Sequence, residues 1–234
     1  NPVHSRERFY EAHDLILKAW TEPGPFPFVG KHYRYRYVNP WPRPLQKPHP
    51  PIWLPGTGSM ETVAFAAERR YPFMMVYSPV EQQRKAYALY RRLAEEQFGY
   101  EASPEQLAFC VPCYVAETDE IARREAEPHL LWLFHVGLKY GPYATPPGYV
   151  SERSMKSMMA ARVKPFTELT MDDLVDQGYV IVGSPDTVIE KLAHYTDRLQ
   201  AGIMVSGAQW GDMPAEKVRK NMELFATRVM PHFR

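Results

Sequence analysis

The sequence predicts an α/β fold built on a parallel sheet. Four short apolar segments have the length and composition of strands that are buried on both faces. A helical pattern follows each segment, so strands and helices alternate along the chain, as they do in α/β proteins. No internal repeat, heptad run or low-complexity tract interrupts this order. The four apolar segments are 52–54, 73–77, 107–115 and 202–207.

Two predicted elements precede this alternating region. Residues 5–20 carry apolar side chains at helical spacing, which predicts an amphipathic helix that ends before Pro23. Residues 32–38 alternate aromatic and polar side chains, which predicts a strand or one arm of a hairpin. Six prolines between positions 40 and 51 then predict an extended connector.

The helices of the alternating region have recognisable start signals. Thr118 is expected to cap a helix that contains Pro128. Ser184 as the cap, with Pro185 at the first helical position, is a strong start signal. The other helices are predicted at about 60–70, 79–97, 172–177 and 214–229. The last of them is expected to bury Val218, Met222, Phe225 and Val229.

Residues 137–166 form an insertion in this pattern. The segment is rich in aromatic residues and turn formers, and a helix is predicted at about 152–162. Long insertions of this kind are often lids or binding loops, and a surface excursion fits the pattern equally well. We interpret residues 1–234 as a single domain in which 137–166 is a candidate lid.

Composition excludes several classes of function. The formal net charge is +1, with basic and acidic residues interleaved, so no footprint for nucleic acid is present. No apolar run approaches the roughly 20 residues of a membrane helix, and the chain does not start with a signal peptide. The histidines are scattered, so no metal site is expected.

Two cysteines occur, and both fall in the third apolar segment. Cys110 and Cys113 are three residues apart on a predicted strand, so their side chains should point to opposite faces. We expect two packed thiols rather than a redox or metal pair. A reducing, cytoplasmic compartment follows from this expectation.

The turn after the first apolar segment carries a candidate binding site. Gly56 and Gly58 allow close approach of the backbone, and Ser59 and Thr62 are three apart where a helix starts. Helix starts attract anions, so these groups could form a phosphate cradle. Alternatively, Ser59 only caps its own helix. The segment is neither a Walker loop nor a dinucleotide fingerprint.

Two further segments have alternative interpretations. The stretch 183–187 could hold an anion, but Asp186 would repel it, and helix capping is the favoured interpretation. Gln209 and Trp210 follow the fourth apolar segment. Side chains at the carboxyl end of a strand can line a ligand pocket, and Trp210 could equally fill the core.

In combination, these motifs resemble the luciferase-like flavin-dependent monooxygenases. That group contains bacterial luciferase and related alkane, sulfonate and nitrilotriacetate monooxygenases. The resemblance spans nearly the whole chain. Its segments are 28–33, 42–53, 56–59, 183–188, 209–214 and 223–231.

The resemblance implies a (β/α)8 TIM-type barrel that binds reduced FMN and activates O2 to oxidise a small organic substrate. The family holds the flavin phosphate through a Ser and a Thr three residues on, a pattern that falls on Ser59 and Thr62, beside the Gly58 N–H. Gln209 and Trp210 would border the ring or the substrate. A separate flavin reductase and a homo-oligomer are expected as partners. Some relatives use a deazaflavin and transfer hydride instead.

The position of the motif in the chain has a consequence for catalysis. Residues 52–54 resemble the fifth barrel strand, so this chain would supply only strands five to eight, preceded by the fourth helix. In the family, the first half supplies the bed for the flavin ring and most catalytic side chains. The catalytic residues are therefore unassigned. The alternatives are a non-catalytic flavin- or phosphate-binding half-barrel, or an unrelated barrel enzyme with a phosphorylated substrate.

Overall fold

The structure is a computed structural model that describes residues 4–139, 152, 156 and 164–233. Its contacts divide the chain into two compact units. The first contains the residues up to Ile52, and the second contains the sheet that begins after Trp53. Most of the candidate lid at 137–166 lies outside the described residues. That the chain is one domain with a lid therefore stays a prediction.

The first unit consists of one helix and one hairpin. Helix α1 spans Ser5–Thr21, as the periodicity predicts. Strands β1 (Phe26–Val29) and β2 (Arg34–Val38) pair antiparallel, which confirms the predicted hairpin arm. In the register of this hairpin, Val29 lies opposite Arg34.

One carboxylate of α1 organises the turn between β1 and β2. Glu11 accepts hydrogen bonds from the backbone N–H groups of Lys31, His32 and Tyr33, with N···O distances of 2.7–3.0 Å. A Cβ added at Gly30 would lie 2.0 Å from the Glu11 Oε1 atom. Glycine at position 30 therefore lets the carboxylate reach the turn.

The second unit is built on a parallel sheet. Its strands are β3 (Leu54–Gly56), β4 (Phe73–Val76), β5 (Leu107–Val115), β6 (Ile181–Gly183) and β7 (Ile203–Gly207). Every strand pair in this sheet is parallel, which confirms the predicted α/β class. β5 pairs with β4, β6 and β7, whereas β3 pairs with β4 alone among the described strands.

Strand β3 begins two residues later than the sequence pattern predicts. Its register is set by β4, because Leu54 lies opposite Phe73 and the Leu54 N–H donates to the Pro72 carbonyl. The preceding Pro50 and Pro51 have no N–H groups to contribute to a sheet. Pairing with the neighbouring strand, rather than local hydrophobicity, decides where β3 starts.

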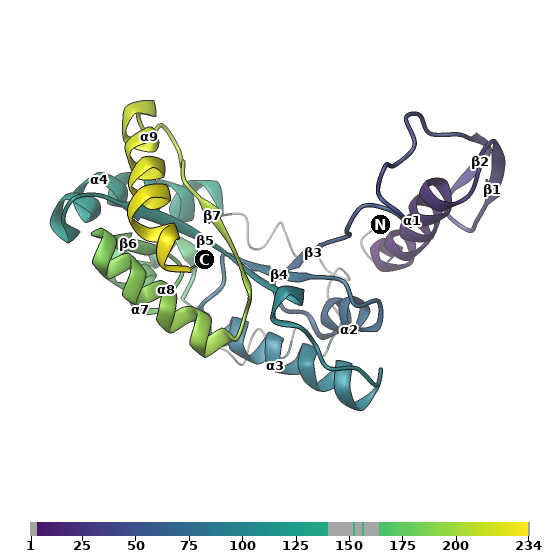
Figure 1. Cartoon of the computed structure of the whole chain (residues 1–234), viewed down its shortest axis with the longest axis horizontal. Coiled ribbons are helices and arrows are strands. Elements are labelled where there is room, and N and C mark those ends of the chain that lie inside the picture. The colour runs from purple at the N-terminus through teal and green to yellow at the C-terminus, as the bar shows by residue number, and fades with distance from the viewer. Residues whose placement is uncertain (1–3, 140–151, 153–155, 157–163, 234) are drawn as a thin grey trace. The chain divides into compact units, whose positions relative to one another are not determined.

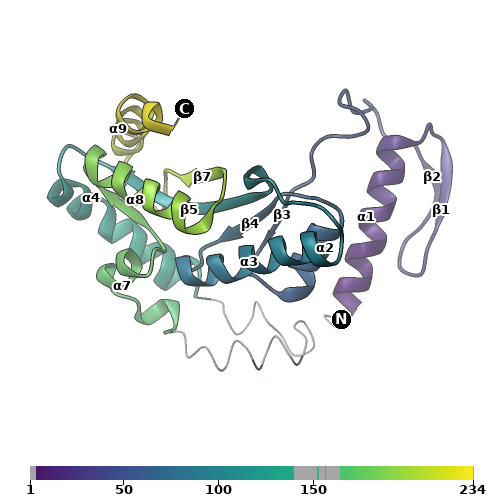
Figure 2. The ribbon, with the colours of Figure 1, turned by 60° about the horizontal axis from the view of Figure 1, so that its bottom comes forward.

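Helices cover one face of this sheet. In both views α2 (Met60–Glu68), α3 (Val80–Glu96) and α8 (Pro185–Leu199) lie side by side along it (Figure 1 and Figure 2). Strand side chains interlock with them. The Phe73 and Tyr87 rings meet edge to face with centroids 6.3 Å apart. The fully buried Phe109 meets Tyr195 of α8 in the same way at 6.4 Å.

Two further helices contact each other, and the longer one also contacts β5 and β6 (Figure 1). They are α4 (Asp119–Trp132), which continues as a π-helical turn over Leu133–Gly137, and α7 (Met171–Asp176). Thr118 accepts the Ile121 N–H at 3.2 Å, which confirms the predicted cap. Short 3-10 turns occur at Pro104–Gln106, Phe166–Glu168 and Met230–Phe233.

The last helix buries a polar residue that the sequence pattern does not predict. Helix α9 spans Ala215–Leu224 and continues as a π-helical turn over Phe225–Val229. Met222 is 55% exposed, so its predicted burial is wrong, whereas Asn221 is only 2% exposed. The reason is that Asn221 completes the hydrogen bonding of β5.

Asn221 bridges β5 and the end of β7. Its side-chain oxygen accepts the Val115 N–H at 2.8 Å, and its side-chain nitrogen donates to the Cys113 carbonyl at 3.1 Å. The same nitrogen lies 3.4 Å from the carbonyl oxygen of Ala208, directly after β7. The pairing of β5 with β7 ends at Pro112, and the Asn221 side chain bonds the peptide groups of β5 that follow.

Both cysteines lie on β5 as free thiols, as predicted. Burial raises the pKa of Cys113 to about 12 and also raises the pKa of Cys110. A thiol with a raised pKa is a poor nucleophile and a poor metal ligand. Separately, no helix in the described ranges is both long and apolar enough to cross a membrane.

The first prediction concerns the turn at residues 30–33. Burial alone raises the pKa of Glu11, but the three backbone donors outweigh it, so the pKa of the folded state lies below the ordinary glutamate range. Such a carboxylate stabilises the fold above its ordinary pKa, and this stability is lost as pH falls through the lowered value. Hydrogen-exchange protection of the Lys31, His32 and Tyr33 amides should therefore fall in that acidic window.

A matched pair of variants tests the same assignment at neutral pH. Glu11→Gln should lower the protection of the same three amides, because the amide loses the charge that strengthens the bonds. Glu22→Gln, at the exposed end of α1, should leave them unchanged. Protection that does not respond to pH or to Glu11→Gln would contradict the role of this carboxylate.

The second prediction concerns Asn221. Asn221→Ala should lower the free energy of unfolding by about 2–4 kcal/mol, because it leaves buried peptide groups of β5 without partners. Chemical denaturation measures this loss. The neighbouring exposed Met222→Ala is the control and should change stability by no more than about 0.5 kcal/mol. Equal effects of the two substitutions would refute the bridging role.

Candidate functional site

The predicted cradle lies where β3 passes into α2. Ser59 is the residue before the helix, with an extended backbone (φ −62°, ψ 136°). Its Oγ lies 2.8 Å from the Thr62 Oγ1, and both side chains are half-buried. The structure thus brings together the two hydroxyls that the sequence places three residues apart. The hydroxyls bond to each other, and the Ser59 side chain makes no capping bond to the α2 backbone.

The two glycines of the loop have different structural roles. Gly58 has a φ of +91°, which strongly favours glycine, and a Cβ there would lie 3.2 Å from the Met75 Cε. At Gly56, a Cβ would lie 3.2 Å from the Phe73 ring and 3.6 Å from the Thr62 Cγ2. Gly58 therefore makes the turn possible, and Gly56 leaves room for the Phe73 ring of β4.

A side chain of helix α3 supports the loop between β3 and α2. The Gln82 side-chain nitrogen donates to the Thr57 carbonyl at 2.9 Å. Because this bond ties the turn to a neighbouring helix, the two hydroxyls stand on a supported loop. Glu61 lies in the first turn of α2, where a negative charge suits the helix dipole. No lysine or arginine of the described chain donates to either hydroxyl.

A second hydroxyl pair with the same spacing lies at the start of α8. The Ser184 Oγ and Thr187 Oγ1 are 3.1 Å apart, and Ser184 caps the helix by accepting the Thr187 N–H at 3.4 Å. Asp119 accepts the Ser184 N–H at 2.6 Å and the Thr187 hydroxyl at 2.9 Å. The bond from the Ser184 N–H, above all, lowers the pKa of Asp119.

The second pair is therefore already occupied by an anion of the chain itself. A carboxylate fills the position in which a bound phosphate would lie, so the capping interpretation of 183–187 is confirmed. The Ser59 and Thr62 hydroxyls differ in this respect. Within the described residues, their bond is to each other and no carboxylate bonds them.

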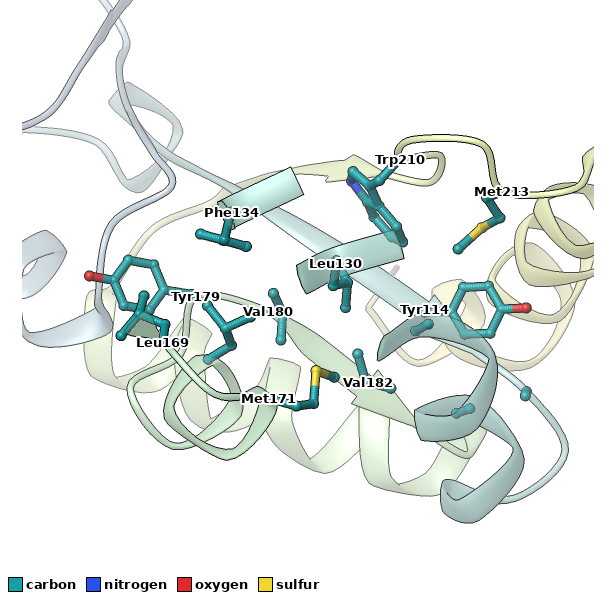
Figure 3. Close-up of a cluster of buried hydrophobic side chains, with 14 residues drawn as sticks. Tyr114, Leu130, Phe134, Leu169, Met171, Tyr179, Val180, Val182, Trp210 and Met213 are labelled. Carbon is teal, nitrogen blue, oxygen red and sulfur yellow. The ribbon is translucent and has the colours of Figure 1, made fainter. Parts of the chain in front are cut away.

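Trp210 is part of the core around α4. It is 5% exposed and belongs to a cluster of buried apolar side chains that we call the α4 cluster (Figure 3). In Figure 3, Trp210 and Leu130 both point into this cluster. Gln209 is exposed. The cluster contains Tyr114, Ala116, Ala122, Ala126, Leu130, Phe134, Leu169, Met171, Leu174, Tyr179, Val180, Val182, Trp210 and Met213.

The burial of Trp210 matches the core alternative for this residue. It packs among the other side chains of the α4 cluster. The assignment of Gln209 and Trp210 to a substrate site stays a prediction. A groove of about 220 Å³ lies between the end of β7 and the last helical segment, and its lining includes Ser206, Ala208 and Phe225 but neither Gln209 nor Trp210.

The loop after β7 also carries a pair that sequence reasoning missed. The His129 Nδ1 lies 2.9 Å from an Asp212 carboxylate oxygen, although 83 residues separate them. Beside them, Gly211 has a φ of +55°, and a Cβ there would lie 3.2 Å from the Trp132 ring. These contacts attach the loop to α4. The available signal was Asp212 itself, a charged residue directly after a predicted strand.

None of the described residues forms a cluster of three or more potential metal ligands. The chemistry that the geometry supports is anion binding. Two convergent hydroxyls and the N–H groups of a helix start could hold a dianion at the carboxyl end of β3. Ligands of parallel α/β sheets commonly bind at this edge of the sheet.

Comparisons with known proteins identify the family and the fold. The family model described as "Luciferase-like monooxygenase" matches residues 1–201. An uncharacterized protein, y4wF, of Sinorhizobium fredii is 24% identical over 212 residues, which cover 89% of this chain and 56% of that protein.

Solved structures share the fold. Monooxygenase RslO1 from Streptomyces bottropensis is 24% identical, with a TM-score of 0.71 over 99% of this chain and 62% of its own. The oxygenating constituent of 3,6-diketocamphane monooxygenase from Pseudomonas putida, solved with FMN, is 22% identical, with a TM-score of 0.63 over 97% and 63%. The coenzyme F420 dependent tetrahydromethanopterin reductase from Methanopyrus kandleri is 16% identical, with a TM-score of 0.66 over 97% and 63%.

Each of these alignments covers most of this chain but a smaller share of the other protein. Nearly all of this chain matches, but it spans less than two thirds of the length of each of these relatives.

Proposed function

The chain belongs to the luciferase-like monooxygenase family, and we propose that it forms the flavin-phosphate half of a flavin-dependent monooxygenase. The complete protein would use reduced FMN and O2 to oxidise a small organic substrate. The family membership and the cradle at the start of α2 support this function. The substrate, the partners and the activity belong to the complete protein.

The observation that carries the proposal is the Ser59–Thr62 pair. The two hydroxyl oxygens lie 2.8 Å apart at the start of a helix, so both can donate to one phosphate group. Hydrogen bonds to a charged acceptor are about twice as strong as neutral ones. Gly58, with a φ of +91°, directly precedes Ser59 in the same turn. Gly56 supports the cradle by close packing.

The chain's own residues would bind and orient the cofactor. When bound, reduced FMN supplies the electrons that activate O2. Ser59, Thr62 and the Gly58 N–H would hold the phosphate and so anchor one end of the cofactor. Gln209 and Trp210 would border the substrate. We assign no catalytic residue within this chain.

The proposal extends to partners and location. Reduced flavin would come from a separate reductase, and the complete enzyme would be a cytoplasmic homo-oligomer. A deazaflavin-dependent oxidoreductase is the second candidate, because the fold is shared with a coenzyme F420 dependent reductase. A non-catalytic flavin-binding protein is the third. Titration with FMN and with coenzyme F420 distinguishes the first two.

The third prediction tests the cradle. Ser59→Ala/Thr62→Ala should weaken FMN binding by about 1–3 kcal/mol, roughly 5- to 150-fold, because two hydrogen bonds to a charged phosphate are lost. Riboflavin has the same ring but no phosphate, so its affinity should not change. Fluorescence titration of the full-length protein measures both affinities.

The second hydroxyl pair provides the control. Ser184→Ala/Thr187→Ala removes hydroxyls of the same spacing, but Asp119 already occupies that position. This variant should lose helix-cap stability and keep its FMN affinity. Unchanged FMN binding by the Ser59→Ala/Thr62→Ala variant, or an equal loss in both double variants, would sink the assignment.

A further inference from the structure

Tyr77 has an unusual backbone conformation at the carboxyl end of β4. Its φ is +46°, in the left-handed region that a bulky side chain rarely adopts. Two other described residues that are not glycine share this conformation, Arg70 and Gln200. Both of them end helices, where a left-handed residue is ordinary. Tyr77 ends no helix and directly follows a strand.

A buried hydrogen-bond network holds this conformation. The Ser78 hydroxyl donates to the Val76 carbonyl at 3.0 Å, so it closes the chain around Tyr77. The Gln83 side-chain nitrogen of α3 then donates to the Ser78 carbonyl at 2.7 Å. Ser78 and Gln83 are 4% and 2% exposed. The strained residue, which costs on the order of 1–2 kcal/mol, is therefore built into the fold.

The Tyr77 ring packs against the α4 cluster, where it contacts an aromatic residue of that cluster. Its ring meets the Phe134 ring edge to face, with centroids 6.2 Å apart and planes at 85°. Burial, and then the nearby Cys110, raise the pKa of Tyr77, so the hydroxyl stays protonated at neutral pH. No described residue accepts a hydrogen bond from it. Among the described residues, the half-buried Tyr77 hydroxyl is thus a donor without a protein acceptor, on the residue that directly follows β4.

The same edge of the sheet carries the phosphate cradle. β3 and β4 are neighbours, and Gly56 lies opposite Met75. Gly58 lies two residues after Gly56, and Tyr77 lies two residues after Met75. Both therefore lie just past the carboxyl ends of adjacent strands. Adjacent strands lie about 4.8 Å apart. The Ser59–Thr62 pair follows β3, and Tyr77 follows the neighbouring strand β4. A ligand whose phosphate is bound by Ser59 and Thr62 would therefore begin about one strand spacing from Tyr77.

We propose that Tyr77 is a flavin-contacting residue whose hydroxyl donates a hydrogen bond to the isoalloxazine end of the bound cofactor. This inference rests on the proposed function, because it takes the Ser59–Thr62 pair as the phosphate seat. The ribityl chain of FMN places the ring away from the phosphate. The left-handed backbone takes the Tyr77 side chain out of the alternation of the strand, and its ring packs against the α4 cluster.

The test separates the ring from the phosphate. Tyr77→Phe keeps the aromatic contact with Phe134 and removes only the hydroxyl. It should weaken FMN and riboflavin binding equally, by about three- to tenfold, and should shift the visible absorption band of bound flavin. The Ser59→Ala/Thr62→Ala variant should weaken FMN alone. The free energy of unfolding of Tyr77→Phe should match that of the unmodified protein.

Tyr179 supplies the matched control. Its ring also meets Phe134, with centroids 5.6 Å apart, but it lies before the amino end of β6. Tyr179→Phe should leave both flavin affinities and the absorption band unchanged. The same loss in Tyr77→Phe and Tyr179→Phe would overturn the proposal, because it would indicate a general packing effect.

Failure of this inference and failure of the proposed function give different results. If Tyr77→Phe binds FMN and riboflavin as the unmodified protein does, while Ser59→Ala/Thr62→Ala loses FMN affinity, Tyr77 is not a flavin contact and the phosphate seat stands. A loss in Tyr77→Phe that affects FMN but not riboflavin would place Tyr77 at the phosphate and overturn the ring contact. An unmodified protein that binds neither flavin would overturn both.

Discussion

The second unit depends on the hydrogen bonding of β5. This strand is nine residues long and pairs with β4, β6 and β7. Its side chains are buried on both faces except at Cys110, so almost every position must be apolar. Its peptide groups are satisfied mainly by neighbouring strands, and side chains such as Asn221 of α9 and Tyr87 of α3 bond others. The elements that carry the candidate site, β3 and the loop after β7, are placed through this strand.

Elements with strong local signals could be predicted closely. β5 is a continuous apolar run, and α8 begins with Ser184 and Pro185, so both appear where the sequence places them. β6 has three residues. Its local signal is the short β-branched run at 180–182, which is not among the four predicted strands, and pairing with the end of β5 fixes it in the sheet. Asn221 is polar, so periodicity assigns it to solvent, and its burial follows from peptide groups more than 100 residues away.

The two hydroxyl pairs show which features of the site could be predicted from the sequence and which could not. Ser59–Thr62 and Ser184–Thr187 have the same spacing at helix starts, and in the structure both pairs lie within hydrogen-bond distance. They differ because Asp119, 65 residues before Ser184, occupies one of them. Long-range packing therefore decides which pair is left for a ligand. Likewise, the strain at Tyr77 cannot be read from composition, because it depends on Gln83 of α3.

β5 bonds residues that are far from it in sequence, which affects how the chain folds during synthesis. The bond between Val115 and Asn221 spans 106 residues, so β5 leaves the ribosome well before its last partners are made. Contacts this distant in sequence slow folding, because a large loop must close before they form. Until then β5 is an apolar, β-prone segment with an unpaired edge, which is the kind of segment that aggregates. The length of chain between β5 and β7 therefore sets the period in which this protein is most vulnerable to misassembly.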